Sequence, residues 1–226
     1  EQAVLTTYAP ALADLDKNVN DRYEVPLLCT LGFLSNGIPR NGQATSAIFL
    51  SKPKLSTLWA AGFSFSKCHA DFIVPYDPHL PQIFDGEEFS RGARLWTHGY
   101  DFYTPPRTLV AHNYSTELGW TKQLGWPKDE AEHAESQARI FSLLRMWDTS
   151  EGRSSGGSPA IAAALDEEGL YGLGKKRSLR QYENFVGIDL RRRRGTANPE
   201  VGEARCGNVR WVRYAASEKM APEHER

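Results

Sequence analysis

Between Trp59 and His112 the chain combines short apolar runs with turns, histidines and the adjacent carboxylates Glu87 and Glu88. Prolines interrupt residues 74–84, and because proline fixes φ and lacks a backbone donor, that segment cannot form a regular helix or an inner strand. Titratable groups set among strand-like runs are what a small-molecule site with a metal requires. We therefore expect residues 59–112 to form one wall of such a site on an α/β fold.

Periodicity predicts a sheet in the first half of the chain and helices in the second half. Residues 11–24 are polar and are expected to form a loop, and residues 35–42 carry strong turn chemistry. The clearest helix is 128–147, with acidic residues in its first turns and an apolar face at 3–4 spacing. Strands are expected at 3–8, 25–33, 44–50, 56–66, 99–103 and 108–114, and helices at 67–73, 89–97, 128–147, 160–165 and 177–185.

Composition limits the partners and the compartment. The 226 residues carry 27 Lys and Arg against 28 Asp and Glu, so no net charge draws the chain to nucleic acid or to a membrane surface. No apolar run approaches the roughly 18 residues of a membrane span. Cys29, Cys68 and Cys206 are odd in number and lack C-x-x-C spacing, which favours free thiols in a reducing compartment. A cytoplasmic location is expected.

Each candidate site residue has two interpretations when it is taken alone. Glu87 and Glu88 follow Gly86, so they could orient sugar hydroxyls or accept a proton, or they could form a solvated acidic turn at a helix start. His112 and His98 could bind a metal or be hydrogen-bonded core histidines. No G-x-S-x-G, P-loop, G-x-G-x-x-G or H-E-x-x-H motif is present, so covalent hydrolase, kinase and Rossmann dehydrogenase functions lack support.

An ordered set of segments over residues 1–190 resembles a known enzyme family. The segments are VLTTY at 4–8, AAGFSFS at 60–66, VPYDPHLPQIFDGEE at 74–88, RLWTHGYDFYTP at 94–105, VAHNY at 110–114 and YGLGKKRSLRQYENFVGIDL at 171–190. They resemble the GlcNAc-transferases that modify a hydroxyproline of the small adaptor subunit of SCF ubiquitin ligases.

The mucin-type polypeptide GalNAc-transferases are a more distant likeness. They share the order of a small-residue A-G strand, a Y-D-P turn, a G-E turn, an R-x-W and a metal-binding histidine. The matching positions here are Ala61-Gly62, Tyr76-Asp77-Pro78, Gly86-Glu87-Glu88, Arg94-Leu95-Trp96 and His112.

The resemblance implies a GT-A-like fold, a mixed sheet flanked by helices, and a retaining, metal-dependent transfer of GlcNAc. The donor would be UDP-GlcNAc, the acceptor a protein or peptide hydroxyl (hydroxyproline or Ser/Thr), and the cofactor Mn²⁺ or Mg²⁺. By the same resemblance, the catalytic residues would be Glu87 and Glu88, the metal ligand His112, and the substrate-binding residues Gly62, Trp96, His98, Tyr100 and Asp101.

One departure from the family pattern concerns the D-x-D metal motif, which should precede VLTTY. Asp14-Leu15-Asp16 follows that strand and is interpreted as a coincidence. Residues 1–190 are therefore expected to be the acceptor and metal part of the domain, without most nucleotide contacts and with weak UDP-GlcNAc binding alone. Residues 191–226 are expected to be a polar, disordered tail. Two alternatives stay open: a degenerate, non-catalytic binding module, and a zinc hydrolase that uses His98, His112 and the glutamates.

Overall fold

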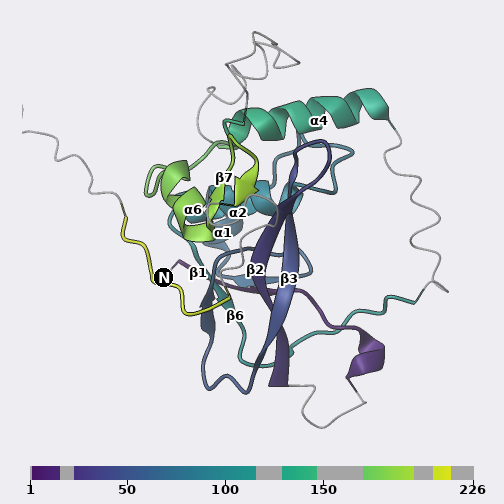
Figure 1. The fold of residues 1–226 in the computed structure, drawn as a ribbon, viewed down its shortest axis with the longest axis vertical. Helices are drawn as coiled ribbons and strands as arrows, with labels where there is room; N and C mark the ends of the chain where they lie inside the picture. The colour runs from purple at the N-terminus through teal and green to yellow at the C-terminus, as the bar shows by residue number, and fades with distance from the viewer. Residues whose placement is uncertain (1, 16–22, 116–128, 147–169, 196–205, 215–226) are drawn as a thin grey trace, which may run out of the picture.

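A four-stranded mixed sheet forms the base of the domain in the computed structural model (Figure 1). Its order is β4–β6–β1–β5: β1 (Ala3–Thr7) pairs in parallel with β6 (Asp101–Thr104) and antiparallel with β5 (Phe63–Ser66), and β4 (Lys54–Ser56) flanks β6. The mixed sheet that the sequence predicts is thereby confirmed. The structure describes residues 2–15, 23–115, 129–146, 170–195 and 206–214.

A long hairpin of β2 (Glu24–Phe33) and β3 (Pro39–Ile48) crosses the domain beside the sheet (Figure 1). Its turn is closed by Asn36, whose Oδ1 accepts a hydrogen bond from the backbone N–H of Ile38 at 3.1 Å. Gly37 takes φ 84°, a conformation that favours glycine. The strand expected at 44–50 begins earlier, because the turn chemistry is confined to 34–38 and residues 39–43 already pair with β2.

The prediction of one strand over residues 56–66 is wrong, because a buried loop separates β4 from β5. Side chains satisfy the loop backbone in place of a strand partner. Thr6 Oγ1 accepts from the N–H of Ala60 at 2.8 Å, and Asn41 Nδ2 donates to the carbonyl of Trp59 at 2.7 Å. The strand expected at 108–114 is reduced to one bridge between Ala11 and His112.

Four α-helices lie within the described residues: α1 (His69–Ile73), α2 (Glu87–Thr97), α4 (Glu130–Leu143) and α6 (Leu179–Val186). A short 3₁₀ turn, η1 (Leu12–Asp14), follows β1, and a two-residue pair of β7 (Ile188–Asp189) and β8 (Arg194–Gly195) follows α6. These helices confirm four of the five predicted ones. The fifth, at 160–165, and the end residues 128 and 147 of the predicted helix 128–147 lie outside the described residues.

Local chemistry fixes where these helices begin and end. Asp129 caps α4 by accepting from the N–H groups of Ala131 and Glu132. Ser178 and Gln181 form a reciprocal capping box at the start of α6, and Gly187 ends that helix with φ 88°.

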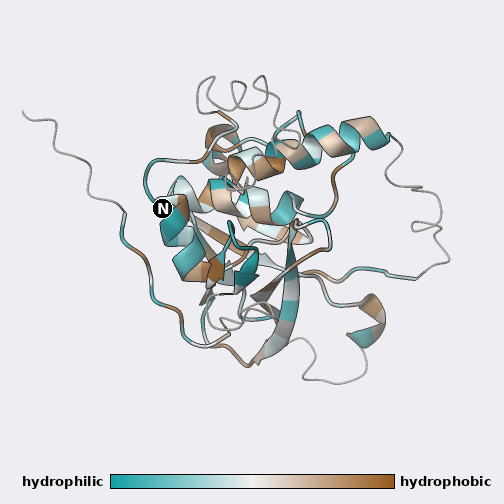
Figure 2. Ribbon diagram, turned by 45° about the horizontal axis from the view of Figure 1, so that its top comes forward, coloured by the Kyte–Doolittle hydropathy of each residue, from teal (hydrophilic) through white to brown (hydrophobic). Residues whose placement is uncertain are grey.

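The core lies where α2 and α6 pack on the sheet. Trp96 of α2 is 1% exposed and stacks on Phe185 of α6 at 5.4 Å, with Tyr182 at 5.1 Å. The helices carry hydrophobic residues on one side and hydrophilic residues on the other (Figure 2). No helix among the described residues is long and apolar enough to cross a bilayer.

Residues 206–214, here called the C-terminal strap, pack against the domain, although they lie within the segment expected to be a polar tail. Cys206 forms a disulfide with Cys29 of β2, so the prediction of free thiols is wrong for these two residues, whereas Cys68 is free and exposed. Trp211 Nε1 donates to Asp101 Oδ2 at 2.6 Å. Neither spacing nor periodicity could reveal this pairing, since 177 residues separate the two cysteines.

Candidate functional site

The predicted site residues fall into two groups at opposite ends of β1. Gly62, Glu87, Glu88 and His112 surround its carboxyl end, whereas Trp96, His98, Tyr100 and Asp101 surround its amino end. Because β1 and β6 are parallel, their carboxyl ends meet at one edge of the sheet, which is where ligands bind in open α/β sheets. We call the first group, with Tyr8, the β1-edge site.

Glu88 is the best-anchored residue of the β1-edge site. Its Oε2 accepts a hydrogen bond from the hydroxyl of Tyr8, and its Oε1 accepts from the N–H of Ala61 at 2.9 Å. Burial raises the pKa of Glu88 above its ordinary value, and the hydrogen bonds from Tyr8 and Ala61 and the nearby charge of Arg40 lower it only in part. The carboxylate is thus held between the end of β1, the buried loop and the start of α2.

Glu87 lies beside Glu88 in the first turn of α2, half-buried, and its carboxyl receives no hydrogen bond from any described residue. Burial and the adjacent charge of Glu88 raise the pKa of Glu87 to about 7, against a lowering effect of Arg91. A carboxyl that titrates near neutral pH can exchange a proton with a substrate, so Glu87 has the chemistry of a general base.

Arg91 lies one turn further along α2 and contacts the segment that precedes this helix. Its Nη2 donates to Asp71 Oδ1 at 2.7 Å and its Nη1 to the carbonyl of Val74 at 3.0 Å. The ring of Tyr76 stacks on the guanidinium at 3.5 Å, a cation–π contact that leaves the other face of the ring exposed. An exposed aromatic ring near Glu87 is suited to pack against a sugar ring.

Gly62 lies at the exposed end of the buried loop, against the end of β1. A Cβ at this position would come within 3.6 Å of the Tyr8 ring and 3.7 Å of the Ala9 nitrogen, which is ordinary contact. The neighbours of Gly62 are therefore residues 7–9 of the chain itself.

His112 reaches the β1-edge site through backbone pairing. Its N–H donates to the carbonyl of Pro10 and its carbonyl accepts from the N–H of Leu12, each at 2.9 Å. The imidazole is exposed and packs on Tyr114, whose hydroxyl donates to the carbonyl of Ala9. The exposed imidazole is available as a metal ligand.

The described residues do not supply a complete metal site. Within them, no group of three or more His, Cys, Asp or Glu side chains could hold an ion. A divalent cation at His112 would need further ligands from elsewhere.

At the amino end of β1, the other predicted residues serve packing and internal pairing. Asp101 accepts from Arg177 Nη2 at 2.8 Å as well as from Trp211, and the guanidinium stacks over Trp96 at 4.4 Å. Tyr100 is fully buried and bonds His69 Nδ1 through its hydroxyl at 2.7 Å. These contacts leave no open face at Trp96, Tyr100 or Asp101 for a sugar.

His98 lies at the same end, where it caps α2. Its Nδ1 contacts the carbonyl of Arg94 at 2.8 Å, and its own carbonyl accepts from the side chain of Gln2. Burial lowers the pKa of His98, which favours the neutral ring. Because Gln2 precedes β1 and His112 pairs beyond it, the two histidines do not share a site.

Sequence reasoning missed Tyr8 and Arg91 as site residues. Tyr8 was part of the VLTTY strand, and only the fold could reveal that its hydroxyl reaches a carboxylate 80 positions away. Arg91 had a local signal, since it follows the carboxylates at i+3 and i+4 on the same helix.

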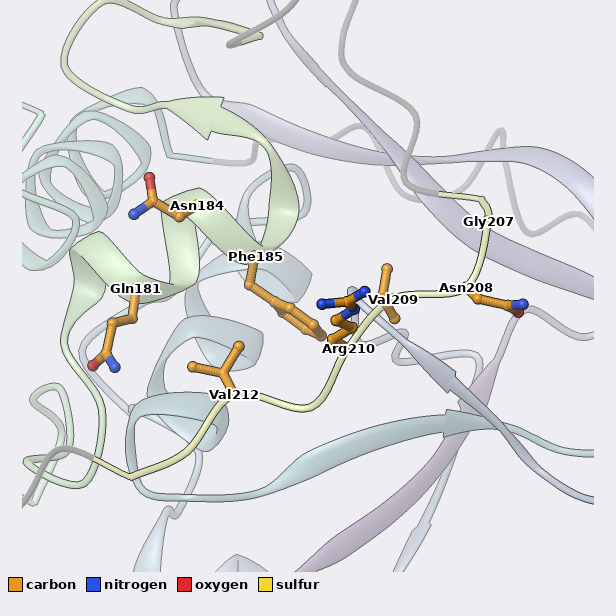
Figure 3. A pocket seen from close by; sticks show the side chains of 8 residues that line it. All are labelled: Gln181, Asn184, Phe185, Gly207, Asn208, Val209, Arg210 and Val212. Carbon is orange, nitrogen blue, oxygen red and sulfur yellow. The ribbon is translucent and has the colours of Figure 1, made fainter.

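A separate groove of about 620 Å³ lies between α6 and the C-terminal strap (Figure 3). Gln181 and Phe185 come from α6, and Asn208, Arg210 and Val212 from the strap. Phe185 connects this groove to the core through Trp96, so the groove lies toward the amino end of β1, away from the β1-edge site. Its wide mouth and mixed lining do not indicate a particular ligand.

Glu87 and Glu88 lie at the carboxyl ends of the parallel strands, which is where ligands bind in open α/β sheets. The sequence also matches a family described as glycosyltransferase (GlcNAc) over residues 1–192, and the chain belongs to this family. No curated protein matches the chain closely enough to count as a relative. The prediction of a GlcNAc-transferase family is confirmed at that level.

Proposed function

We propose that this chain is the acceptor-side part of a GT-A-type, retaining transferase that moves GlcNAc from UDP-GlcNAc to a protein hydroxyl. The observation that carries the proposal is the pair of Glu87 and Glu88 at the carboxyl edge of β1, in a chain that belongs to a GlcNAc glycosyltransferase family. The acceptor is proposed to be a hydroxyproline or a Ser/Thr of a protein or peptide.

The chemistry required of this part is positioning and proton handling. Glu88 offers a fixed carboxylate to sugar hydroxyls, and Glu87 offers a base near the acceptor. The exposed face of Tyr76, backed by Arg91, provides a surface on which a pyranose ring can stack.

We also propose that a divalent cation, Mn²⁺ or Mg²⁺, binds at this site with His112 as one ligand. The described residues supply no further ligands for the ion, so the roles proposed for this site are those of side chains alone. The zinc hydrolase alternative needs His98 and His112 in one site, and their placement at opposite ends of β1 argues against it.

A non-catalytic binding module is the second candidate function. It would keep the β1-edge site as an acceptor-binding surface and would show no sugar transfer. The incomplete metal ligand set among the described residues is the observation that favours it.

A cytoplasmic location stays a prediction, and the disulfide of Cys29 and Cys206 weighs against it, because disulfides persist mainly in oxidising compartments. Alkylation of the protein immediately on lysis, followed by mass spectrometry, reports the state of these thiols. Alkylated Cys29 and Cys206 would support the reducing compartment.

The test of the proposed function is a donor screen with the full-length protein. UDP release from UDP-GlcNAc, UDP-GalNAc and UDP-glucose is measured with Mn²⁺ and hydroxyproline- or Ser/Thr-containing peptides. We expect UDP-GlcNAc to be preferred, and we expect His112→Ala and Glu87→Gln to lose activity. Binding of donor and peptide without UDP release would favour the binding module instead.

A further inference from the structure

We propose that Glu87 and Glu88 have different roles and that Tyr8 is the residue that separates them. Tyr8 and the Ala61 amide fix Glu88 as a receptor for substrate hydroxyls, which leaves Glu87 as the base for the acceptor. This inference rests on the proposed function and assigns a positioning role to Tyr8.

The hydrogen bonds of Glu88 define its role. An ionised carboxylate can accept about four hydrogen bonds, two at each oxygen. Tyr8 occupies one position at Oε2 and Ala61 one at Oε1, so each oxygen keeps one position for a substrate hydroxyl. The two donors come from the end of β1 and from the buried loop, and they stabilise the charged form. Glu88 can therefore accept hydrogen bonds from substrate hydroxyls while it keeps its bonds to Tyr8 and Ala61.

Glu87 has the opposite character, because no described donor holds its carboxyl. The charged and titratable groups around it are Glu88 and Arg91 on its own helix, Tyr8 on the strand side and Tyr76 on the preceding loop. Arg91 is already committed to its own ion pair and to the ring of Tyr76, so it offsets the charge of Glu87 only in part. Glu87 is thus left able to take up and release a proton near neutral pH.

Transfer forms one bond and breaks one bond at the anomeric carbon. The acceptor hydroxyl loses its proton to a carboxylate oxygen of Glu87 while its oxygen forms the bond to the anomeric carbon of GlcNAc on the face that UDP leaves, so the configuration is retained. The bond from that carbon to the β-phosphate oxygen breaks, and UDP leaves with the electron pair. Glu87 afterwards releases the proton to solvent, and Glu88 keeps its bonds to Tyr8 and Ala61 throughout.

Tyr8→Phe is the variant that tests this division, because it removes one donor and keeps the ring. Tyr214→Phe is the matched control, since it removes a hydroxyl that donates to the carbonyl of Gly99 at the other end of β1. Two readouts are compared: the pH profile of kcat for GlcNAc transfer by the full-length protein, and carboxyl ¹³C NMR titrations of Glu87 and Glu88, which need no activity.

We expect wild-type kcat to rise with the titration of Glu87 near pH 7. Tyr8→Phe should raise the pKa of Glu88 and lower kcat about tenfold, and Glu87→Gln should lower kcat about 100-fold or more and abolish the pH dependence. Tyr214→Phe should change neither readout. Unchanged titrations and an unchanged kcat profile in Tyr8→Phe would overturn the inference, as would a Glu88 that titrates near pH 7 in place of Glu87.

The two proposals fail in different ways. A wild-type protein that transfers no GlcNAc refutes the proposed function, whereas the NMR titrations still decide whether Tyr8 sets the state of Glu88. Normal transfer with equal titrations of both glutamates overturns the division of roles alone.

Discussion

The disulfide between Cys29 and Cys206 is predicted to be a major source of stability. It joins β2 to the C-terminal strap across 177 positions. In the chain-entropy view, closing a loop of that length in the unfolded state contributes about 5 kcal/mol, and measured values for single disulfides are typically about 2–4 kcal/mol. The strap also brings Trp211 to Asp101 and Tyr214 to Gly99, and those hydrogen bonds weaken when the anchor is lost.

Cys206→Ser is the direct perturbation, and Cys68→Ser is its matched control, because Cys68 is exposed and unpaired. For a chain of this size each kcal/mol shifts Tm by about 2–4 °C, so a loss of 2–5 kcal/mol lowers Tm by about 4–20 °C. Calorimetry without reductant should show this shift for Cys206→Ser and none for Cys68→Ser.

Reductant should bring the wild type down to the Tm of Cys206→Ser and leave that variant unchanged. A stabilising role of the disulfide is refuted if Cys206→Ser has the same Tm as the wild type under non-reducing conditions. It is also refuted if all three cysteines of the folded protein react with iodoacetamide without prior reduction.

Three further predictions concern residues that carry charge or an unusual backbone. Gly86→Ala should destabilise the start of α2 by about 1–3 kcal/mol in urea unfolding, because Gly86 has φ 90° and a Cβ there would lie 2.6 Å from Ile38; Gly207→Ala, which meets nothing within 4 Å, should be nearly neutral. Because the pKa of Glu87 is raised, between about pH 4.5 and 7 the native state binds a proton there that the unfolded state has released. The free energy of unfolding that this proton contributes is therefore lost as the pH rises through that window. Glu87→Gln should therefore be more stable than the wild type above pH 7, by at most about 3 kcal/mol, and a fixed difference in urea midpoints at all pH values would contradict this. Asp101→Asn should lower the free energy of unfolding by about 3 kcal/mol, because the buried guanidinium of Arg177 would lose its carboxylate partner. A raised KM without a loss of stability would instead support Asp101 as a substrate ligand.

The local structure of this chain could be predicted because it depends on local chemistry. Asp129 and Ser178 cap helices whose periodicity was visible, and Pro10 follows a β-type run that forms the first strand. The strand expected at 56–66 failed because its apolar residues, among them Trp59, are buried by a loop whose backbone is satisfied by Thr6 and Asn41. No local pattern encodes those distant partners.

The candidate site could be predicted in part for the same reason. Glu87, Glu88 and His112 were predicted from the family resemblance, and the fold brings the segments that carry them to the carboxyl end of β1. Trp96 and Asp101 have the same residue types as sugar-binding groups, yet the fold commits them to Phe185, Arg177 and the strap. Residue type predicts what a side chain can do, and only tertiary packing decides whether it faces a ligand.

The most direct measurement of catalysis at the β1-edge site is GlcNAc transfer from radiolabelled UDP-GlcNAc to a hydroxyproline peptide by the full-length protein. Glu87→Gln is compared with Glu135→Gln, the same substitution at an exposed position of α4. The β1-edge site predicts that kcat/KM falls about 100-fold or more in Glu87→Gln and is unchanged in Glu135→Gln. Equal transfer by both variants would contradict the assignment of sugar transfer to this edge of the sheet.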